Sequence, residues 1–351
     1  MAHAAQGRRT VRALVTGAAG FIGGHVVSVL AAQGATVRAF DRHPPPAALD
    51  SSEVEFVRGD VLDADSVRRA VEGCDAVFHL AAVYSYARAD ASLMQAVNVR
   101  GTQTVLDAAL RGQRRRVVHT SSCATCGPVR GRHATERDFP PGAELVVPYK
   151  RTKLEGERLA LRAAREGGDV VIVNPTVPVG PGDLRPTPTG KMVADVAAGR
   201  ARGYLARSAL NVVAVEDVAR GHSLAFELGL SGERYLLGGE DMTMHEIFAA
   251  VARAAGRPAP RIPVPWRAAY ATALVLSTAI RVAGREPELL VLDEVRAGRL
   301  PHLFDDSKAR LQLGYESRPA REALAQAART YLVQPEGPPR DLAASSNASR
   351  A

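Results

Sequence analysis

Two short stretches of the chain hold residue types whose spacing could carry chemistry. The stretch "PYKRTK" places Tyr149 and Lys153 four residues apart, so that on a helix they share one face. A cation one turn from a phenol favours the phenolate and lowers the pKa of the tyrosine, which makes it usable as a general acid/base. The pair therefore predicts proton transfer by Tyr149. The alternative is a surface tyrosine that packs on the lysine stem.

The stretch "HTSSCATCGP" (119–128) offers two further kinds of chemistry. Ser121 and Ser122 follow a predicted strand and could supply a catalytic hydroxyl, whereas Cys123-x-x-Cys126 could be a redox or metal pair. Zinc normally needs four ligands, and the sequence shows no second Cys/His pair with ligand spacing. Thioredoxin-like chemistry would place the first cysteine at a helix N-terminus, which this stretch does not predict. We therefore interpret both cysteines as loop residues.

A glycine-rich turn, "LVTGAAGFIGGH", follows the first predicted strand and opens the first predicted helix. Gly17 permits a tight turn, Gly20 lets the backbone approach a pyrophosphate, and Gly23 lets the helix pack closely on the strand. The N-terminus of such a helix presents free N–H groups and the positive end of its dipole to phosphates. The turn predicts a dinucleotide site, and the alternative is a turn that binds no nucleotide.

An acidic residue, Asp41, ends the next predicted strand in "TVRAFDR". A carboxylate at this place bonds the ribose hydroxyls of adenosine and repels a 2′-phosphate, so Asp41 favours NAD over NADP. Arg42 favours the opposite choice, because an adjacent guanidinium can hold that phosphate. NAD is therefore the predicted cofactor, with NADP as the alternative.

The elements that would position these residues alternate between strand and helix in the first half of the chain, which predicts βαβ units and a parallel sheet. Segment 174–190 is dense in Pro and Gly and predicts no regular structure. The predicted fold class is α/β, a Rossmann-type doubly wound parallel sheet with a smaller, mostly helical C-terminal substrate region. The predicted divisions are a flexible N-terminus (1–10), a Rossmann domain (11–175), a substrate region interleaved with it (176–333) and a disordered tail (334–351).

Composition narrows the class of protein. The 351 residues carry a net charge of +8, but the basic residues are scattered and only 5% are aromatic, which disfavours a nucleic-acid partner. The N-terminus lacks the apolar core of a signal peptide. The uncharged run Ala268–Ile280 is shorter than the ~20 residues that span a bilayer. It predicts a buried or interfacial helix, with membrane-surface contact as the alternative. We expect a cytoplasmic protein with a small-molecule substrate and no integral membrane segment.

The motifs along the chain form a set: "TGAAGFIG", Gly59-Asp60, "HLAA" (79–82), Asn98 in "VNVRGT", "TSS" (120–122), Tyr149-x-x-x-Lys153 and Asn174-Pro175. With these motifs the chain resembles, over nearly its whole length to about Leu332, the extended short-chain dehydrogenase/reductases. The resemblance implies that Tyr149 is the acid/base, that Lys153 holds the nicotinamide ribose, and that Ser122 supplies the hydroxyl that orients the substrate oxygen.

The resemblance also implies a cofactor site. Asp60 and Val61 would flank the adenine, the segment 80–82 would line the dinucleotide, and the segment after Pro175 would close over nicotinamide and substrate. The expected cofactor residues are Gly17, Gly20, Phe21, Ile22, Gly23, Asp41, Arg42, Asp60, Val61, Leu80, Ala81, Ala82, Asn98, Tyr149, Lys153 and Pro175.

Within the family, the stretches 171–191, 210–222 and 232–247 resemble the hopanoid-associated sugar epimerases, a group also similar to dihydroflavonol reductases. Dehydration of a sugar is disfavoured, because Cys123 and Ala124 follow Ser122 where dehydratases carry acids. The leading hypothesis is a sugar epimerase of the nucleotide-sugar type that acts by transient hydride transfer to NAD. The alternatives are an NADPH-dependent ketone or aldehyde reductase of the dihydroflavonol type and, as a minor one, a non-catalytic dinucleotide-binding regulator. A homodimer is expected by analogy with the family.

Five residues are candidates for the substrate pocket. Tyr84 and Tyr86 would wall it, while Arg185, Lys191 and Asn211 would hold an anionic or polyhydroxylated substrate. For each of the last three, the alternative is a solvated loop residue.

Overall fold

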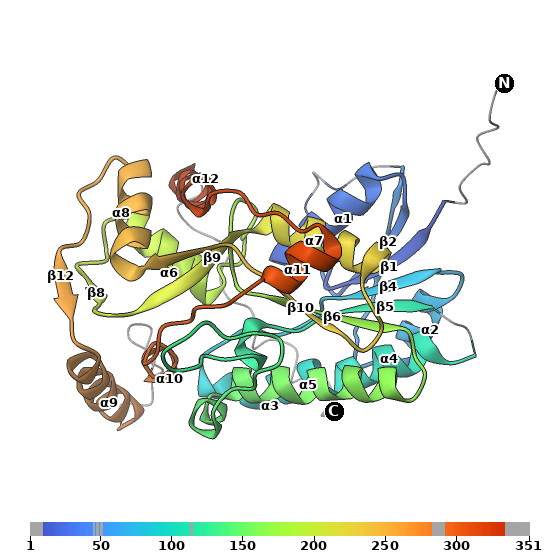
Figure 1. Ribbon diagram of the computed structural model, residues 1–351, viewed down its shortest axis with the longest axis horizontal. Coiled ribbons are helices and arrows are strands. Elements are labelled where there is room, and N and C mark those ends of the chain that lie inside the picture. The colour runs from blue at the N-terminus through green and yellow to red at the C-terminus, as the bar shows by residue number, and fades with distance from the viewer. Residues whose placement is uncertain are drawn as a thin grey trace, which may run out of the picture.

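The computed structural model describes residues 10–44, 46, 49, 52–112, 115–282 and 292–333. Its centre is a sheet of seven parallel strands in the order β10-β6-β5-β4-β1-β2-β3 (Figure 1). The order reverses between β1 and β4, and the carboxyl ends of the strands at such a point form the crevice in which open α/β sheets bind ligands. The strands are β1 (Arg12–Thr16), β2 (Thr36–Asp41), β3 (Val54–Arg58), β4 (Ala76–His79), β5 (Arg116–Thr120), β6 (Val170–Pro175) and β10 (Arg234–Leu237).

Helices cover both faces of this sheet, so the predicted doubly wound α/β fold is confirmed (Figure 1). Strands β4 and β6 are buried along their whole length, as expected for parallel strands covered on both sides. One face carries α1 (Phe21–Ala32), α7 (Val215–Leu228) and α11 (Ser307–Leu313). The other carries α2 (Ala64–Val71), α4 (Thr102–Leu110) and α5 (Pro148–Arg165), with α3 (Ala91–Met94) and the π-helical η3 (Gln95–Gly101) leading into α4.

A second region follows β6 and has its own apolar core. Its three-stranded sheet has the order β11-β9-β7. Its elements are β7 (Val177–Val179), α6 (Pro188–Ala197), β9 (Ala209–Ala214), β11 (Glu240–Thr243), α8 (Met244–Ala254) and α12 (Ala320–Val333). A small two-stranded unit of β8 (Gly203–Leu205) and β12 (Ile262–Val264) leads to α9 (Trp266–Val282) and α10 (Leu292–Ala297). Short 3-10 helices are η2 (Arg88–Asp90), η4 (Cys123–Thr125) and η5 (Gly142–Val146).

The prediction that 174–190 has no regular structure is wrong in part. Strand β7 lies inside this segment and pairs with β9 at the edge of the small sheet, where the missing N–H of Pro178 is tolerated. Helix α6 then begins with Pro188, and proline suits the first position of a helix. The predicted helical C-terminal region is confirmed by α6 to α12, and β10 returns from it to extend the central sheet. Residues 1–9 and the predicted tail 334–351 lie outside the described residues.

The helices are short or polar compared with a membrane span. Along the described ranges, none of them is long and apolar enough to cross a bilayer.

Candidate active site

The three predicted catalytic residues meet where β5 ends and α5 begins. Ser122 follows β5 by two residues, and its hydroxyl accepts a hydrogen bond from the Ala124 N–H at 3.2 Å, which starts the tight turn η4. Tyr149 and Lys153 lie in the first two turns of α5. The Lys153 ammonium donates to the carbonyl oxygen of Thr120 at 2.7 Å, which ties the helix to the end of the strand. The Ser122 hydroxyl also interacts with Tyr149, so the geometry assembles one site.

The electrostatics of Tyr149 differ from the sequence-based expectation. Burial raises the pKa of Tyr149 above its ordinary value, and the interaction with Ser122 opposes this rise only in part. Lys153 was expected to lower this pKa, but its ammonium is directed to the Thr120 carbonyl. In the absence of a bound cofactor, Tyr149 is therefore a neutral phenol at neutral pH, the form that can donate a proton.

Burial also acts on Lys153. Desolvation lowers its pKa to about 8, and the carboxylate of Glu157 one turn further along α5 opposes this change. The ammonium is thus easily deprotonated near neutral pH compared with an ordinary lysine. A cation whose charge depends on its surroundings in this way suits a residue beside a proton-transfer group.

A buried polar network holds the turn that Ser122 caps, here called the serine turn (residues 122–125). Glu157 is fully buried and forms an ion pair of 3.1 Å with Arg234 of β10. Its other oxygen accepts hydrogen bonds of 2.6 Å from the side chains of Thr125 and Asn174. Asn174 also donates to the carbonyl oxygen of Ser122 at 3.1 Å. The position of Ser122 therefore depends on a charge pair that joins α5 to the last strand of the sheet.

The glycine turn has the shape that the sequence predicted. Gly17 has a φ of +73°, and a Cβ there would lie 2.7 Å from the Ala81 nitrogen. A Cβ on Gly23 would lie 2.0 Å from the Gly17 carbonyl oxygen, so the helix approaches the turn as closely as backbone allows. Helix α1 has neither a side-chain cap nor an acidic residue in its first turn, which leaves its N-terminal N–H groups open to an anion. These features fit the pyrophosphate of a dinucleotide.

Asp41 lies beside this turn, at the end of β2. Its carboxylate accepts hydrogen bonds from the Ala19 N–H at 3.1 Å and from the His43 N–H at 3.0 Å. The acid is thus held next to the glycine turn, where the ribose of a bound adenosine would lie.

The remaining expected cofactor residues surround the same crevice. Leu80, Ala81 and Ala82 follow β4, and the N–H of Leu80 bonds to Thr16 at the end of β1. Asp60 accepts the Leu62 N–H at 2.9 Å and shapes the loop after β3, in which Val61 is buried. The structure gives Asn98 a different use, since its amide bonds to both backbone groups of Val83 and to the Thr152 hydroxyl. Its side chain positions the loop that leads to Tyr84.

Tyrosine side chains form the wall of the site beside Tyr149. The ring centroid of Tyr84 lies 4.5 Å from that of Tyr149, and the Tyr86 ring lies 5.7 Å from Tyr84 and 6.4 Å from Tyr149. Burial raises the pKa of Tyr84 to about 12, while hydrogen bonds with Tyr86 and Thr189 oppose the rise. The structure thus brings together the two tyrosines that the sequence suggested for this wall and the acid/base.

The three polar candidates for substrate binding already have protein partners. Arg185 reaches the carbonyl oxygen of Ala19 in the glycine turn, at 3.3 Å. Lys191 forms an ion pair of 2.7 Å with Asp195 on its own helix. Asn211 is buried in β9, and its amide bonds to Gly239 and Asp241. Arg185 therefore faces the cofactor side of the crevice, whereas Asn211 is occupied in joining β9 to its neighbours.

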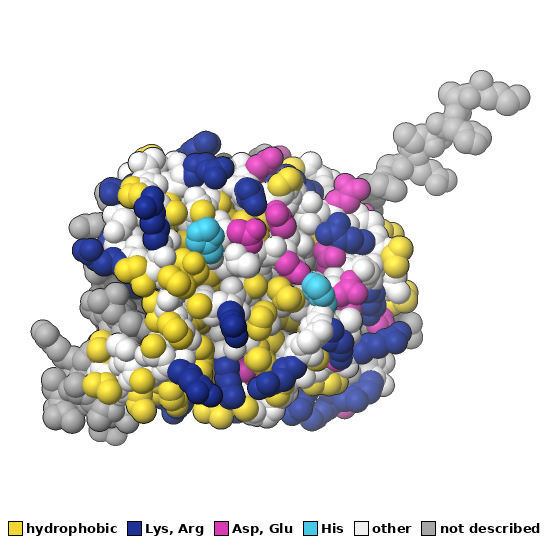
Figure 2. Space-filling view, turned by 60° about the vertical axis from the view of Figure 1, so that its left-hand side comes forward, with side chains coloured by type: hydrophobic (Ala, Val, Ile, Leu, Met, Phe, Trp, Pro, Cys, Tyr) yellow, Lys and Arg dark blue, Asp and Glu magenta, His cyan; other side chains and the backbone are white. Residues whose placement is uncertain are grey.

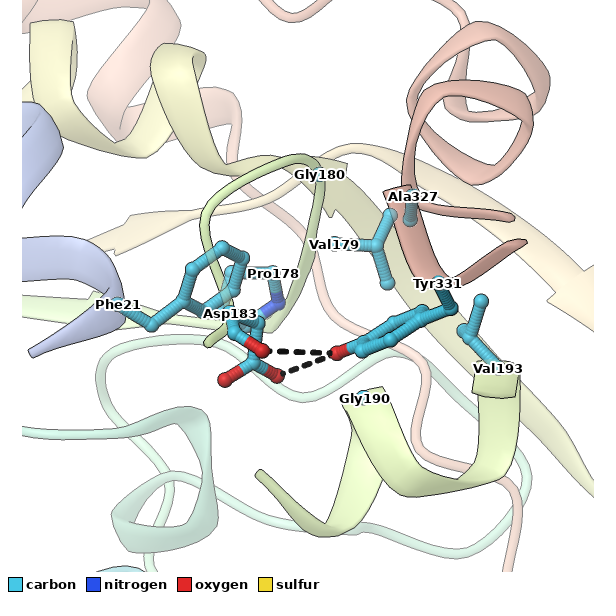
Figure 3. A pocket seen from close by; sticks show the side chains of 9 residues that line it. All are labelled: Phe21, Pro178, Val179, Gly180, Asp183, Gly190, Val193, Ala327 and Tyr331. Atoms are coloured by element: carbon cyan, nitrogen blue, oxygen red, sulfur yellow. Dashed lines mark hydrogen bonds between the residues drawn. The ribbon is translucent and has the colours of Figure 1, made fainter. Parts of the chain in front are cut away.

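The segment after β6 is closed against the helices on either side of it (Figure 3). The Tyr331 hydroxyl of α12 bonds to the Asp183 carboxylate at 3.1 Å, and His25 of α1 bonds to the Pro181 carbonyl oxygen at 2.9 Å. The cavity that remains between Phe21, Gly180 and Tyr331 holds about 10 Å³, room for about one water molecule. It is too small for a substrate. It lies where the segment after β6 packs on helix α1.

Comparison with known proteins decides the family. Residues 13–238 match the model of the NAD dependent epimerase/dehydratase family. The chain belongs to this family. A protein named putative dihydroflavonol 4-reductase from Synechocystis is 36% identical over 319 residues, which cover 89% of this chain and 92% of that protein. The sterol demethylase protein B of Methylococcus capsulatus is 37% identical over 320 residues, 90% of this chain and 96% of that protein.

Solved structures agree with this assignment. The crystal structure of gox2253 has a TM-score of 0.80 and 35% identity, and the match covers 93% of this chain and 99% of that one. The UDP-glucose 4-epimerase of Thermus thermophilus, solved in complex with NAD, has a TM-score of 0.71 and 25% identity, with 92% and 99% covered. The resemblance seen in the sequence is confirmed: the chain is an extended short-chain dehydrogenase/reductase and an enzyme.

Two residues near the tyrosine wall of this dehydrogenase/reductase escaped the sequence analysis. Thr189 of α6 bonds with Tyr84, and the Glu294 carboxylate of α10 acts electrostatically on both Tyr84 and Tyr86. More than a hundred positions separate either residue from the tyrosines in the sequence. No local pattern marks such contacts, because the fold of the second region alone brings them together.

The cysteine pair lies directly behind Ser122. Burial raises the pKa of Cys123 to about 12 and that of Cys126 well above its ordinary value. The Cys126 sulfur accepts a hydrogen bond from Arg234 at 2.9 Å, and Cys123 donates weakly to the Thr176 carbonyl oxygen. Both are buried free thiols. Thiols in such surroundings stay protonated and unreactive.

Four buried histidines predict acid sensitivity of the fold. Burial lowers the pKa of His79 and His302 to about 3 and of His222 to about 4, and it lowers that of His119 as well. Below pH 6.5 these histidines therefore bind protons in the unfolded chain but stay neutral in the folded chain. The free energy of unfolding should fall as the pH drops from 6.5 towards 4. Urea denaturation at several pH values measures this slope.

His119 offers a matched control for that slope. Its two ring nitrogens have no hydrogen-bond partner among the described residues, so replacement by leucine removes a titrating group without breaking a bond. His119→Leu should reduce the acid slope by up to about 1.4 kcal/mol per pH unit. An unchanged slope would mean that His119 already accepts a proton in the folded protein.

Proposed function

We propose that this protein is an NAD(P)-dependent dehydrogenase/reductase that interconverts a ketone and a secondary alcohol on a largely apolar, ring-containing substrate. The observation that carries the proposal is the tyrosine wall, with Tyr84 at 4.5 Å from Tyr149 between ring centroids. Aromatic rings that pack at such distances favour a flat apolar ligand beside them. This choice follows the reductase alternative of the sequence analysis in preference to the sugar epimerase.

The protonation state of Tyr149 supports the reducing direction. A bound nicotinamide would supply or take up the hydride. Tyr149, kept as a neutral phenol by burial, would donate its proton to the ketone oxygen, and the Ser122 hydroxyl would hold that oxygen in place. By the family resemblance, the Lys153 ammonium, fixed at the end of β5, would hold the nicotinamide ribose. In alcohol oxidation the same groups would act in reverse.

The polar candidates support the same choice. A nucleotide-sugar epimerase has to hold a diphosphate and a polyhydroxylated ring, for which Arg185, Lys191 and Asn211 were the expected anchors. Arg185 bonds to the glycine turn, Lys191 is paired with Asp195, and the buried amide of Asn211 bonds to Gly239 and Asp241. The family match and the fold of the Thermus thermophilus epimerase keep sugar epimerisation as the second candidate.

Initial rates with two classes of substrate test the proposal. The purified protein is given NADH or NADPH with a panel of cyclic and aryl ketones, and separately with UDP- and dTDP-hexoses. We expect oxidation of the dinucleotide only with apolar ketones. Tyr84→Ala should then raise KM about tenfold, as expected for losing an aromatic contact of ~1–1.5 kcal/mol. Conversion of a nucleotide sugar to its epimer, with no response to the ketones, would refute the proposal.

The Asp41 carboxylate predicts whether the protein prefers NADH or NADPH. Its carboxylate would repel a 2′-phosphate, so the wild-type protein should bind NADH more tightly than NADPH. Asp41→Asn keeps an acceptor for the Ala19 N–H but removes the charge, and it should shift the ratio of the two dissociation constants towards NADPH about tenfold, ~1.4 kcal/mol. Fluorescence titration measures both constants.

Arg42→Gln is the control for this result. It removes the neighbouring cation, and it should weaken NADPH binding while it leaves NADH binding unchanged. A wild-type preference for NADPH that Asp41→Asn does not alter would contradict the assignment of Asp41.

A further inference from the structure

One end of the molecule is built from β8, β12 and α9, at the left of Figure 1 and away from the central sheet. Strand β12 pairs with β8 and leads directly into α9. The inner face of α9 is well packed, since Ala269 and Ala273 are buried and the indole N–H of Trp266 bonds to the Val295 carbonyl oxygen at 2.8 Å. In its first turns the helix is thus fixed to α10 by this inner face.

Between Trp266 and Ser277, the outer face of α9 is apolar and exposed. Leu274 is 45% exposed and Val275 is 67% exposed, and Ile262 of the adjoining strand β12 is 60% exposed. Ala268 and Ala271 lie on the same side of the helix and are exposed as well. Leu274 and Val275 are neighbours on α9, and large aliphatic side chains exposed side by side mark a site of contact with a partner or a membrane.

Arginines lie at the same end of the molecule, on the segments that carry β8 and β12. The segments 199–208 and 256–268 contain six arginines and neither aspartate nor glutamate. All six are exposed, and within the described ranges only Arg200 forms an ion pair, with Asp195. A groove of about 390 Å³ is lined by Arg202, Arg257, Arg261 and Ile262. Figure 2 shows hydrophobic side chains gathered in the left half of the view and acidic ones mostly in the upper right, with basic side chains on both sides. The six are Arg200, Arg202, Arg207, Arg257, Arg261 and Arg267.

Exposed aliphatic side chains together with these exposed arginines favour one kind of binding partner. A helix that presents an apolar face between basic residues lies in the interface of a membrane with anionic lipids. A two-fold dimer through this surface would place the same arginines against each other, which is unfavourable. A nucleic acid would pair with the arginines but would gain nothing from Leu274, Val275 and Ile262.

We propose that this surface, formed by the outer face of α9, Ile262 and the six arginines, docks on a membrane that contains anionic lipids. The protein would lie on the bilayer and not cross it. The docked end adjoins the active site, because Asp293 of α10 forms a bidentate ion pair with Arg88 in the loop after Tyr86, at 2.9 and 3.2 Å. Docking would therefore bring an apolar substrate close to the tyrosine wall, but it does not depend on the proposed reaction.

Vesicle co-sedimentation of the full chain tests the proposal. Vesicles of phosphatidylcholine alone are compared with vesicles that also contain phosphatidylglycerol, at low and at high salt. The protein should partition at least about tenfold more strongly to the anionic vesicles at low salt, and high salt should weaken this binding. Equal partition to both kinds of vesicle, or none to either, would overturn the proposal.

Variants locate the binding surface. Arg202→Gln/Arg257→Gln/Arg261→Gln and, separately, Val275→Ser should each lower partition to anionic vesicles about tenfold or more. The matched control, Arg158→Gln/Arg162→Gln/Arg165→Gln, removes the same charge from exposed positions of α5 and should keep the wild-type partition. Circular dichroism confirms that each variant folds. An equal loss in the control, or a dimer in light scattering that Val275→Ser dissociates, would show that the surface does not serve membrane docking.

Discussion

Replacing Tyr149 with phenylalanine is expected to abolish turnover and to leave dinucleotide binding intact. The neutral phenol of Tyr149 is the group that we expect to pass a proton to the substrate oxygen, and its loss should lower kcat about 10²- to 10⁴-fold, the range for general acid/base catalysis. Single-turnover hydride transfer, measured beside NADH titration by fluorescence, separates the two effects.

Tyr86→Phe is the matched control for this experiment. It removes a hydroxyl from the same aromatic wall, 6.4 Å between ring centroids from Tyr149, and should change kcat by less than about tenfold. A Tyr149→Phe variant that retains most of its turnover would show that another group transfers the proton. If Tyr149→Phe equals the wild-type protein in every assay, the result would instead favour a non-catalytic regulator, the minor alternative of the sequence analysis.

Replacing Arg234 with leucine is expected to cause the largest loss of stability. The substitution leaves the Glu157 carboxylate buried without its cation, which costs about 3–5 kcal/mol of the free energy of unfolding. Because Asn174 joins Glu157 to the Ser122 carbonyl oxygen, kcat should fall as well. Urea denaturation and the hydride-transfer assay measure the two consequences.

Two further variants make this prediction specific. Arg132→Leu removes an arginine that is 53% exposed and paired with Asp138, and it should lower the free energy of unfolding far less, because water screens an exposed ion pair. The double variant Arg234→Leu/Glu157→Gln removes the unpaired charge and should recover part of the lost stability. If Arg234→Leu destabilises the protein no more than Arg132→Leu does, the buried pair does not support the serine turn as described.

The features that sequence alone predicted are those encoded by local spacing. The glycine turn, the strand that ends at Asp41 and the pair Tyr149 and Lys153 each depend on neighbours within one or two turns of chain, and the structure shows the expected elements around them. Strand β10 was missed because it is only four residues long. The chain also passes through much of the second region between β6 and β10, so no neighbouring pattern marks this strand.

The chemistry of the site was harder to predict than its location. The raised pKa of Tyr149 comes from burial, which the spacing to Lys153 does not reveal. The partners of Arg185 and Asn211 lie far away in the sequence. Lys191 is different, because Asp195 lies one helical turn further on, and a salt bridge between such positions can be recognised from their spacing alone.

Transfer of deuterium from the cofactor tests the central claim most directly. The protein is incubated with 4,4-dideuterated NADH or NADPH and the ketone that reacts fastest in the panel, and the product and oxidised dinucleotide are quantified by mass spectrometry. The proposed reaction predicts one deuterium on the carbinol carbon of the product for each dinucleotide oxidised. A protein that oxidises no dinucleotide with any ketone, but inverts a sugar carbinol at constant cofactor, would contradict it.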